Sequence, residues 1–475
     1  MESRRSSDLG LFFEPRSVAV FGSLRQGDGE GYVVIDNMLK FGFTGSIYPV
    51  NPSYSQVLGI RAYPAVNDVP GPVDLAVVIT PPATVAGVIR QCAQKGIRAA
   101  IIVTEGFAET GEAGARLQEQ VADIARSHGM RLIGPNTIGI INSANGLVTN
   151  PYRIGYDRVR KGSIAYSSQS GVIGASAQPL EDRAYPISKM CDFGNKCDVD
   201  EADWLDYLVH DAETKVIAMH IECVRGGRRF LDVLRRVSDS KPVVVLKAGR
   251  TEPGARASAS HTGSLAGSEK VGNDVFRQFG AITVNTLQEF WDIPKVFASQ
   301  PLPGGNRIAI VSPSGGTGVM AIDAAVESGL VVAQLTRATL DRLSKFPANL
   351  ARNPCDVGPS MVLSEDRQSV QETALGALLG DANVDCAAIA LYAGPIGSIT
   401  DTANIMDELR QRVSKPMAIW IYGPKLSMRE DLALRLEAMG LPTYLELQTA
   451  VKALAVAAEY AQARLDRSRV EGFSQ

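Results

Sequence analysis

The 475-residue sequence lacks several features, and each absence excludes a class of protein. It has no stretch of about 18 consecutive apolar residues, so we expect no contact with a membrane. Its 48 basic and 51 acidic residues give a net charge of only −3 without a basic patch, so we expect no nucleic-acid partner. The residues from Met1 to Asp8 lead into no apolar segment, which predicts no secretory signal and a cytoplasmic location.

Cysteine and histidine are also scarce. The six cysteines are scattered, and Cys191 and Cys197 have neither a second cysteine pair nor a histidine at the spacing of zinc ligands. We therefore predict reduced thiols and no metal site in this chain. With 45% apolar and 21% charged residues, the composition is that of a globular protein, and the length suggests roughly three domains of ~150 residues.

Short β-branched runs alternate with helical patterns along the chain. This alternation is typical of α/β folds in which crossover helices join parallel strands. In the first third we predict strands at Ser17–Phe21, Ser46–Val50, Asp74–Thr80, Arg98–Val103 and Arg131–Ile133, with helices at Ala83–Lys95 and Gly114–His128. Breaks near Asn150–Gly155 and a linker at Pro301–Gly305 predict domains at residues 1–155, 156–302 and 303–475.

The second and third domains resemble copies of one another. The run Gly162–Val172 parallels Asn306–Gly316, and Lys241–Leu246 parallels Lys415–Trp420. The segment beginning at Gly280 likewise parallels the one beginning at Gly440. We predict a Rossmann-like domain followed by two flavodoxin-like domains.

His261 is the most informative residue. It is one of only four histidines and lies in the run Ser258–Ser268, which is rich in hydroxyl side chains and glycine. We expect a flexible, uncrowded loop, in which a neutral imidazole could attack a phosphorus or carbonyl centre. The alternative is a histidine on a surface loop with no chemical role.

The repeat provides an internal control. The second copy has no histidine after the strand that ends at Ile421, and Ala393 stands where the first copy has Glu222. Since one copy folds without either group, we expect His261 and Glu222 to serve function. A carboxylate bonded to one imidazole nitrogen would fix the tautomer and leave the other nitrogen free to attack. The alternative is a solvent-facing glutamate.

Two serine- and glycine-rich turns each follow a predicted strand and are expected to open a helix. Backbone amides at a helix N-terminus favour an anion, so both turns are candidate phosphate sites. The alternative is two ordinary turns with serine caps. The candidate phosphate-binding residues are Ser168, Gln169, Ser170, Gly171, Ser314, Gly315 and Gly316.

Over nearly its whole length, the chain resembles the NDP-forming acyl-CoA synthetases, relatives of the succinyl-CoA synthetase α subunit. The resemblance rests on Lys247–Arg250 followed by Ser260–Gly267, and on the motifs Ser168–Gly171, Ile133–Asn136 and Asn353–Asp356. It implies that ATP, a carboxylic acid and CoA are converted to acyl-CoA by way of an acyl phosphate. It also implies that His261 is transiently phosphorylated and that Glu222 holds it.

The same resemblance identifies the first domain as a CoA-binding domain. Its implied CoA site lies at the carboxyl ends of successive strands and comprises Gly22, Ser23, Arg25, Asn51, Pro52, Thr80, Pro81, Glu105, Gly106 and Asn136. The turn at Gly22 lacks the GxGxxG pattern and a convincing ribose-binding acid, which argues against an NAD(P)-linked oxidoreductase. The sequence Gly22-Ser23-Leu24 departs from the Gly-Ala-Ser of many relatives, which leaves the contacts to the CoA phosphates open.

The family needs an ATP-grasp domain, and the residues from Arg464 to Gln475 are too few to form one. The resemblance therefore implies an α subunit, with ATP or ADP and Mg²⁺ bound mainly by a separate ATP-grasp β subunit in an αβ or α2β2 assembly. A non-catalytic regulator that binds CoA or acyl-CoA is the alternative. The acid, the choice between ADP and GDP and the physiological direction stay open.

Overall fold

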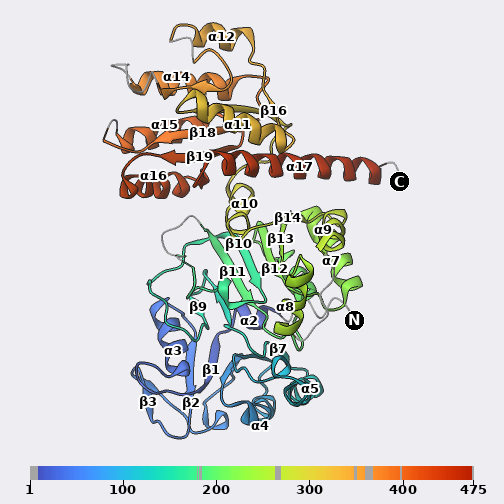
Figure 1. The fold of residues 1–475 in the computed structure, drawn as a ribbon. Helices are drawn as coiled ribbons and strands as arrows, with labels where there is room; N and C mark the ends of the chain where they lie inside the picture. The colour runs from blue at the N-terminus through green and yellow to red at the C-terminus, as the bar shows by residue number, and fades with distance from the viewer. Residues whose placement is uncertain are drawn as a thin grey trace. The chain divides into compact units, whose positions relative to one another are not determined.

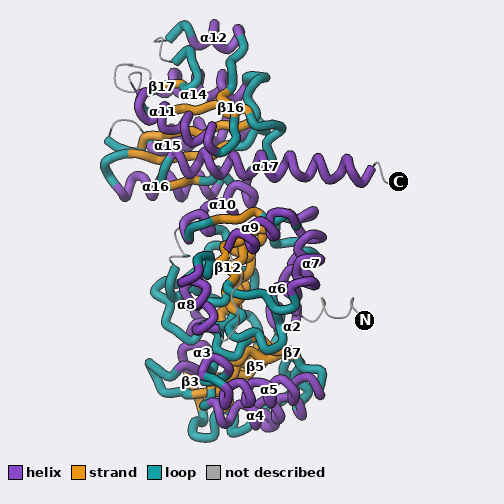
Figure 2. Tube along the Cα trace, turned by 45° about the vertical axis from the view of Figure 1, so that its right-hand side comes forward, coloured by secondary structure: helices purple, strands orange, loops and turns teal. Residues whose placement is uncertain are grey.

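The chain forms two compact units that meet in sequence between Phe290 and Trp291, inside helix α10 (Leu287–Ser299). The computed structural model describes residues 9–178, 180, 185–262, 269–346, 350–358, 367–395 and 398–472. Figures 1 and 2 trace the elements along the chain. Each unit is described by itself below.

The first unit begins with a parallel five-stranded sheet in the order β2-β1-β5-β6-β7. Its strands are β1 (Ser17–Gly22), β2 (Ser46–Val50), β5 (Leu75–Ile79), β6 (Ala99–Ile102) and β7 (Arg131–Ile133). The helices are α2 (Gly10–Phe13), α3 (Glu30–Lys40), α4 (Pro82–Gln94) and α5 (Glu112–Ser127), with 3-10 turns η2 (Val66–Asp68) and η3 (Ala108–Thr110). A small hairpin pairs β3 (Gln56–Val57) with β4 (Ile60–Arg61).

This sheet is buried on both faces. Alternate residues of its strands pack against α3 and α2 on one side, as Val18 does, and against α4 and α5 on the other, as Ala19 does. Burial on both faces explains why the strands read as nearly continuous apolar runs in the sequence.

The first unit contains a second sheet, ordered β14-β13-β12-β10-β11-β8-β9. Its strands are β8 (Ile140–Asn142), β9 (Leu147–Val148), β10 (Lys161–Ser168), β11 (Ile187–Asp192), β12 (Val216–Ile221), β13 (Val243–Lys247) and β14 (Ile282–Val284). The strands β10 to β14 are parallel, whereas β8 is antiparallel to β11. Around the sheet lie η4 (Gly171–Ile173), α6 (Glu201–Leu208), α7 (Gly227–Ser240), α8 (Glu252–Thr262) and α9 (Glu269–Gln278).

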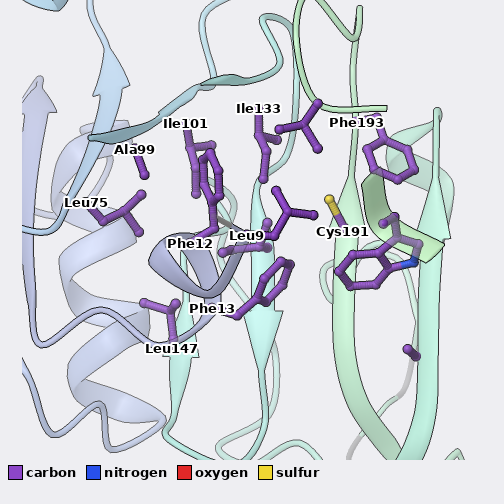
Figure 3. Packing of buried hydrophobic residues seen from close by; sticks show 14 of the residues in the cluster. Leu9, Phe12, Phe13, Leu75, Ala99, Ile101, Ile133, Leu147, Cys191 and Phe193 are labelled. Atoms are coloured by element: carbon purple, nitrogen blue, oxygen red, sulfur yellow. The ribbon is translucent and has the colours of Figure 1, made fainter. Parts of the chain in front are cut away.

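One hydrophobic core joins these two sheets. Phe12 and Phe13 of α2 are fully buried between residues of the first sheet, such as Ile101, and residues of the second, such as Cys191 (Figure 3). The Phe13 ring also lies 5.1 Å from that of Trp204 in α6. Full burial of such a side chain stabilises the fold by about 1.5–3 kcal/mol, so α2 fixes the two sheets to one another.

The second unit holds a parallel sheet in the order β16-β15-β18-β19-β20, with β17 also paired to β15. Its strands are β15 (Arg307–Ser312), β16 (Val331–Val332), β17 (Cys355–Asp356), β18 (Cys386–Tyr392), β19 (Met417–Tyr422) and β20 (Thr443–Tyr444). Its helices are α11 (Gly315–Glu327), α12 (Arg337–Leu343), α14 (Arg367–Gly380), α15 (Ile399–Arg412), α16 (Leu426–Ala438) and the long α17 (Leu447–Gly472).

The predicted α/β fold with parallel sheets is confirmed. Counted from their first strands, β10 to β14 follow the flavodoxin-like order 2-1-3-4-5. Strands β15 to β20 follow the same order when β16 and β17, which both pair with β15, are counted as one position. Their registers also agree, because Ser168 pairs with Asp192 as Ser312 pairs with Asp356. Among the described helices, none has both the length and the apolarity of a membrane span. The three domain boundaries stay predictions.

Candidate functional site

A cavity of about 1200 Å³ lies at the carboxyl ends of the first sheet. Its walls come from the loops after β1, β2, β5, β6 and β7, and it is completed by residues that follow β10. In the order β2-β1-β5-β6-β7, successive strands are added on one side of β1 and then, from β5 on, on its other side. Open α/β sheets bind ligands at such a switch point, which here lies between β1 and β5. The cavity is therefore the principal candidate for a small-molecule site.

The predicted CoA-site residues gather in this cavity, with one exception. Gly22, Ser23, Asn51, Pro52, Thr80, Pro81, Glu105, Gly106 and Asn136 all line it. Arg25 does not, because its exposed guanidinium turns to Asp28, with 2.7 Å between Nε and Oδ1.

Local contacts hold two of these loops in place. A Cβ atom at Gly22 would lie 2.7 Å from the carbonyl oxygen of Ile79, so only glycine lets β1 end this close to β5. The side-chain amide of Asn51 donates to the Gly22 carbonyl at 2.8 Å. Beyond β6, Glu109 accepts from the backbone amides of Gly106 and Phe107 at 2.6 and 3.0 Å.

Glu109 also connects the first sheet to the second. Its other carboxylate oxygen accepts from the side-chain amide of Asn195, which follows β11, at 2.5 Å. Although burial opposes ionisation, these hydrogen bonds lower the pKa of the Glu109 carboxyl. The carboxylate thus fixes the Gly106 wall of the cavity against the loop after β11.

The first predicted phosphate loop, Ser168–Gly171, reaches the same cavity. Gln169, Ser170 and Gly171 line it, whereas Ser168 closes the turn: its Oγ donates to the Ser170 carbonyl and accepts from the Ser170 amide, both at 2.8 Å. The loop opens only the three-residue 3-10 turn η4, not the α-helix we predicted. Gly171 begins this turn and Gly174 directly follows it, and both glycines disfavour a continued helix.

The second predicted loop, Ser314–Gly316, lies in the second unit and opens α11 as predicted. Ser314 is its N-cap, accepting a hydrogen bond from the Thr317 amide at 3.3 Å. All three loop residues lie in the described part of the chain, and none of them lines the large cavity.

The Gln169 side chain fastens its loop to the end of β12. Its oxygen accepts from the amides of Glu222 and Cys223 at 2.5 and 2.8 Å. Its nitrogen donates to the Cys223 carbonyl at 3.1 Å and to a Glu201 carboxylate oxygen at 3.0 Å. These four bonds use the whole hydrogen-bonding capacity of the amide. Any contact between Gln169 and a phosphate must therefore be made by the backbone of Gln169.

Glu222 directly follows β12, at the strand end where we predicted it, and only 7% of the residue is exposed. Its carbonyl accepts from the Lys247 ammonium at 2.8 Å, and its amide is held by Gln169. Burial lowers the pKa of Lys247. The structure therefore corrects the alternative of a solvent-facing glutamate.

His261 lies in α8, which contacts the turn η3. The helix extends through Thr262, so the predicted loop is wrong for residues 258–262. Alanines at 255, 257 and 259 favour a helix, and they outweigh the nearby serines. The His261 side chain and residues 263–268 lie outside the described residues.

Sequence reasoning missed two buried groups beside the Ser168–Gly171 loop. Burial raises the pKa of Asp192 to about 6, helped by the nearby charge of Glu222, and Asp192 lines the cavity. His220 contacts Ser168, with 3.1 Å between Nδ1 and Oγ. Burial, with the charge of Lys247, lowers the His220 pKa to about 4, so the ring is neutral at pH 7. The sequence signal that could have revealed both residues is a polar residue near the end of an otherwise apolar, buried strand.

Comparisons with known proteins match these features. Residues 16–143 match a family model described as a CoA binding domain, and residues 161–297 match one described as a succinyl-CoA ligase like flavodoxin domain. The chain is 37% identical to acetate–CoA ligase [ADP-forming] II subunit alpha of Pyrococcus furiosus, over 92% of this chain and 94% of that protein. The chain belongs to the NDP-forming acyl-CoA synthetase family. It is accordingly an NDP-forming acid–CoA ligase.

Two further members of the NDP-forming acyl-CoA synthetase family extend the comparison. Acetate–CoA ligase [ADP-forming] II of Archaeoglobus fulgidus is 36% identical over 96% of this chain, which spans 68% of that longer protein. The acetyl-coenzyme A synthetase 1 of Ca. Korarchaeum cryptofilum, solved in complex with phosphate and ADP, is 31% identical. That structure superposes with a TM-score of 0.87 and covers 96% of this chain and 97% of its own.

Proposed function

We propose that this chain is the α subunit of an NDP-forming acid–CoA ligase that works through an acyl phosphate and a phosphohistidine at His261. Three domains, at residues 1–155, 156–302 and 303–475, would divide the work. The first would bind CoA, the second would carry Glu222 and His261, and Ser314–Gly316 of the third would contribute to phosphate binding.

One observation carries the proposal. The cavity that holds the candidate CoA-site residues is also lined by Gln169, Ser170 and Gly171 of the predicted phosphate loop. A CoA molecule bound along the first sheet can therefore present its thiol to a phosphorylated intermediate on that loop. A cavity serving CoA binding alone would not need a second sheet's phosphate loop in its wall.

The proposed chemistry moves one phosphoryl group and then one acyl group. The terminal phosphoryl of ATP is transferred to an imidazole nitrogen of His261, and ADP leaves. A carboxylate oxygen of the acid attacks this phosphorus, which frees the imidazole and forms the acyl phosphate. The CoA sulfur then attacks the acyl carbon; the carbon–oxygen bond to phosphate breaks, and the thiol proton leaves to solvent. Glu222 would orient the imidazole and stabilise its positive charge.

ATP and Mg²⁺ would be held mainly by an ATP-grasp β subunit, in a cytoplasmic αβ or α2β2 assembly. The name of the Pyrococcus relative, a subunit alpha, supports this division, as does the greater length of the Archaeoglobus relative. Mg²⁺ would neutralise charge on the transferred phosphoryl group.

The proposal is tested by incubating the purified chain with acetyl phosphate and CoA. We expect acyl-CoA to form and the phosphoryl group to be found on His261 by peptide mass analysis. Binding of CoA without any phosphoenzyme would overturn the catalytic proposal and would indicate a CoA-binding regulator. The β subunit is tested separately, by co-expression with a candidate ATP-grasp chain, and failure to co-elute would reject that partner.

A further inference from the structure

A second, smaller cavity of about 20 Å³ lies directly behind the Ser168–Gly171 loop. Ser168 and Ser170 form part of its wall. Most of the remaining wall is apolar and includes Ile138, Ile140, Ile141, Tyr166, Ile173 and Met190. It is thus a small, mainly apolar space next to a candidate phosphate site.

The small cavity adjoins the large one. Ile138, Ser170 and Asp192 line both. A molecule whose phosphoryl group lies on the Ser168–Gly171 loop could therefore reach into the small cavity on one side and meet a thiol from the large cavity on the other.

An acyl phosphate has the shape that this arrangement fits. Its phosphoryl group and its alkyl group are separated by one carbonyl carbon, which is the atom that the thiol must attack. We propose, on the basis of the function proposed above, that the small cavity receives the alkyl group of the acid and restricts the enzyme to short aliphatic acids of about the size of acetate.

The size of the cavity sets this limit. About 10–15 Å³ accommodates one water molecule, so 20 Å³ admits roughly one methyl-sized group. The wall cannot easily retreat, because Ile140, Ile173 and Met190 are at least nine-tenths buried in packed surroundings. A Cβ atom at Gly174 would lie 2.0 Å from the Cδ1 atom of Ile138, so these two residues already pack closely. Each surplus methylene should reduce kcat/KM by about 10- to 200-fold.

Besides Ser170, the shared wall contains one carboxylate, that of Asp192. Asp192 Oδ2 accepts from the Ile138 amide at 2.8 Å, whereas no donor among the described residues has hydrogen-bond geometry to Oδ1. A water bound near this oxygen is the competing occupant of so small a cavity. If such a water stays in place, the length of the alkyl group has no effect on its fit.

The test measures kcat/KM for phosphorylation of His261 by acetyl, propionyl, butyryl and benzoyl phosphate. We expect acetyl phosphate to be preferred over propionyl phosphate by about 10- to 200-fold, and over the larger two by more. Equal rates, or faster labelling by the larger acyl phosphates, would overturn the inference while leaving the proposed function intact. No labelling by any of the four would instead count against the proposed function.

Truncation of the wall provides a second test. Ile173→Ala should raise the propionyl-to-acetyl ratio of kcat/KM by about tenfold or more, because it enlarges the small cavity alone. Ile310→Ala, the same truncation at a buried residue of β15, is the control and should leave the ratio unchanged. If Ile173→Ala does not fold, Ile173→Val should shift the ratio in the same direction by a smaller factor. An unchanged ratio in a folded Ile173 variant would contradict the inference.

Discussion

The two flavodoxin-like sheets share their strand order and differ in the residues at the carboxyl ends of their strands. In the first sheet these ends carry Gln169, His220, Glu222 and Lys247, and the corresponding positions of the second are Pro313, Ala390, Tyr392 and Ile421. The strand register therefore corrects the expected match of Glu222 with Ala393. Of these, Pro313, Ala390 and Ile421 have no polar side-chain group that needs a buried hydrogen-bond partner, and Tyr392 is only partly buried. The comparison indicates that the fold itself does not need the polar cluster. Because burial of polar groups costs desolvation free energy, we infer that the cluster serves function.

What the two sheets keep in common is instructive as well. Ser168 and Ser312 each donate to the carbonyl two residues on, at 2.8 and 3.0 Å. Each serine also lies opposite an aspartate on the neighbouring strand, Asp192 or Asp356. The serine turn is therefore a property of the repeated fold, whereas Gln169 and Glu222 belong to the first copy alone.

The largest expected effect comes from the histidine that the second sheet lacks. His261→Ala should reduce acyl-CoA formation at least about a thousandfold, because no other group would carry the phosphoryl. Binding of CoA should be unchanged. The matched control is His210→Ala at an exposed histidine, which should keep full turnover. Full turnover in His261→Ala would refute the phosphohistidine.

Glu222 has the next largest expected effect, since the second sheet has Tyr392, not a carboxylate, at this position. Glu222→Ala should slow phosphoenzyme formation by about a hundredfold or more, because the imidazole loses its orienting carboxylate. Rapid-quench measurement of labelled protein tests this, with the exposed Glu430→Gln as control. Normal accumulation of phosphoenzyme would remove Glu222 from the mechanism.

Substitution of Gln169 tests how much the polar cluster contributes to the stability of the first unit. Gln169→Leu leaves the buried amides of Glu222 and Cys223 without their acceptor, so the first unit should lose about 2–4 kcal/mol of stability. Calorimetry should show this loss in the transition of the first unit alone. Pro313→Ala, at the equivalent position of the second sheet, breaks no side-chain hydrogen bond and should cost less than 1 kcal/mol or so.

Asp192 gives the smallest effect, and the size of this effect depends on pH. Its folded-state pKa of about 6 exceeds the 3.8 of an ordinary aspartate, so the folded chain binds a proton more tightly than the unfolded chain. Stability therefore falls as pH rises from about 4 to 6, by up to about 3 kcal/mol, and the loss persists above pH 6. Asp192→Asn should raise the melting temperature at pH 8, with a gain that shrinks below pH 5.

Asp356 is the matched position for that experiment. Its carboxylate accepts from the Gly358 amide at 3.1 Å and lies 3.9 Å from Arg352 Nη2. Asp356→Asn weakens the ion pair and should give no stability gain at pH 8. An equal gain from both substitutions would show that burial of the Asp192 charge is not the cause.

The sequence predicted the buried strands well because apolar β-branched runs mark them directly. Strands β1, β2 and β7 lie within one residue of their expected bounds. Strand β11 was harder to see because Lys189 interrupts its apolar pattern, although that ammonium is buried against Asp211. Asp192 was missed with it.

The candidate site likewise has a part that the sequence predicted and a part that it did not. Turn residues at strand ends could be placed in one cavity because parallel strands bring their carboxyl ends to one edge. The part played by Gln169 could not be predicted, since its bonds to Glu222 and Cys223 join residues more than 50 positions apart. The local sequence around His261 likewise suggested a loop, whereas its alanines favour the helix that is observed.

The most direct test of the account is to locate the phosphoryl group after the chain has reacted with acetyl phosphate. The account predicts one acid-labile phosphoryl group per chain, mapped to His261 and removed when CoA and acetate regenerate acyl-CoA. A stoichiometric label on any other residue, or none while acyl-CoA is still formed, would contradict it.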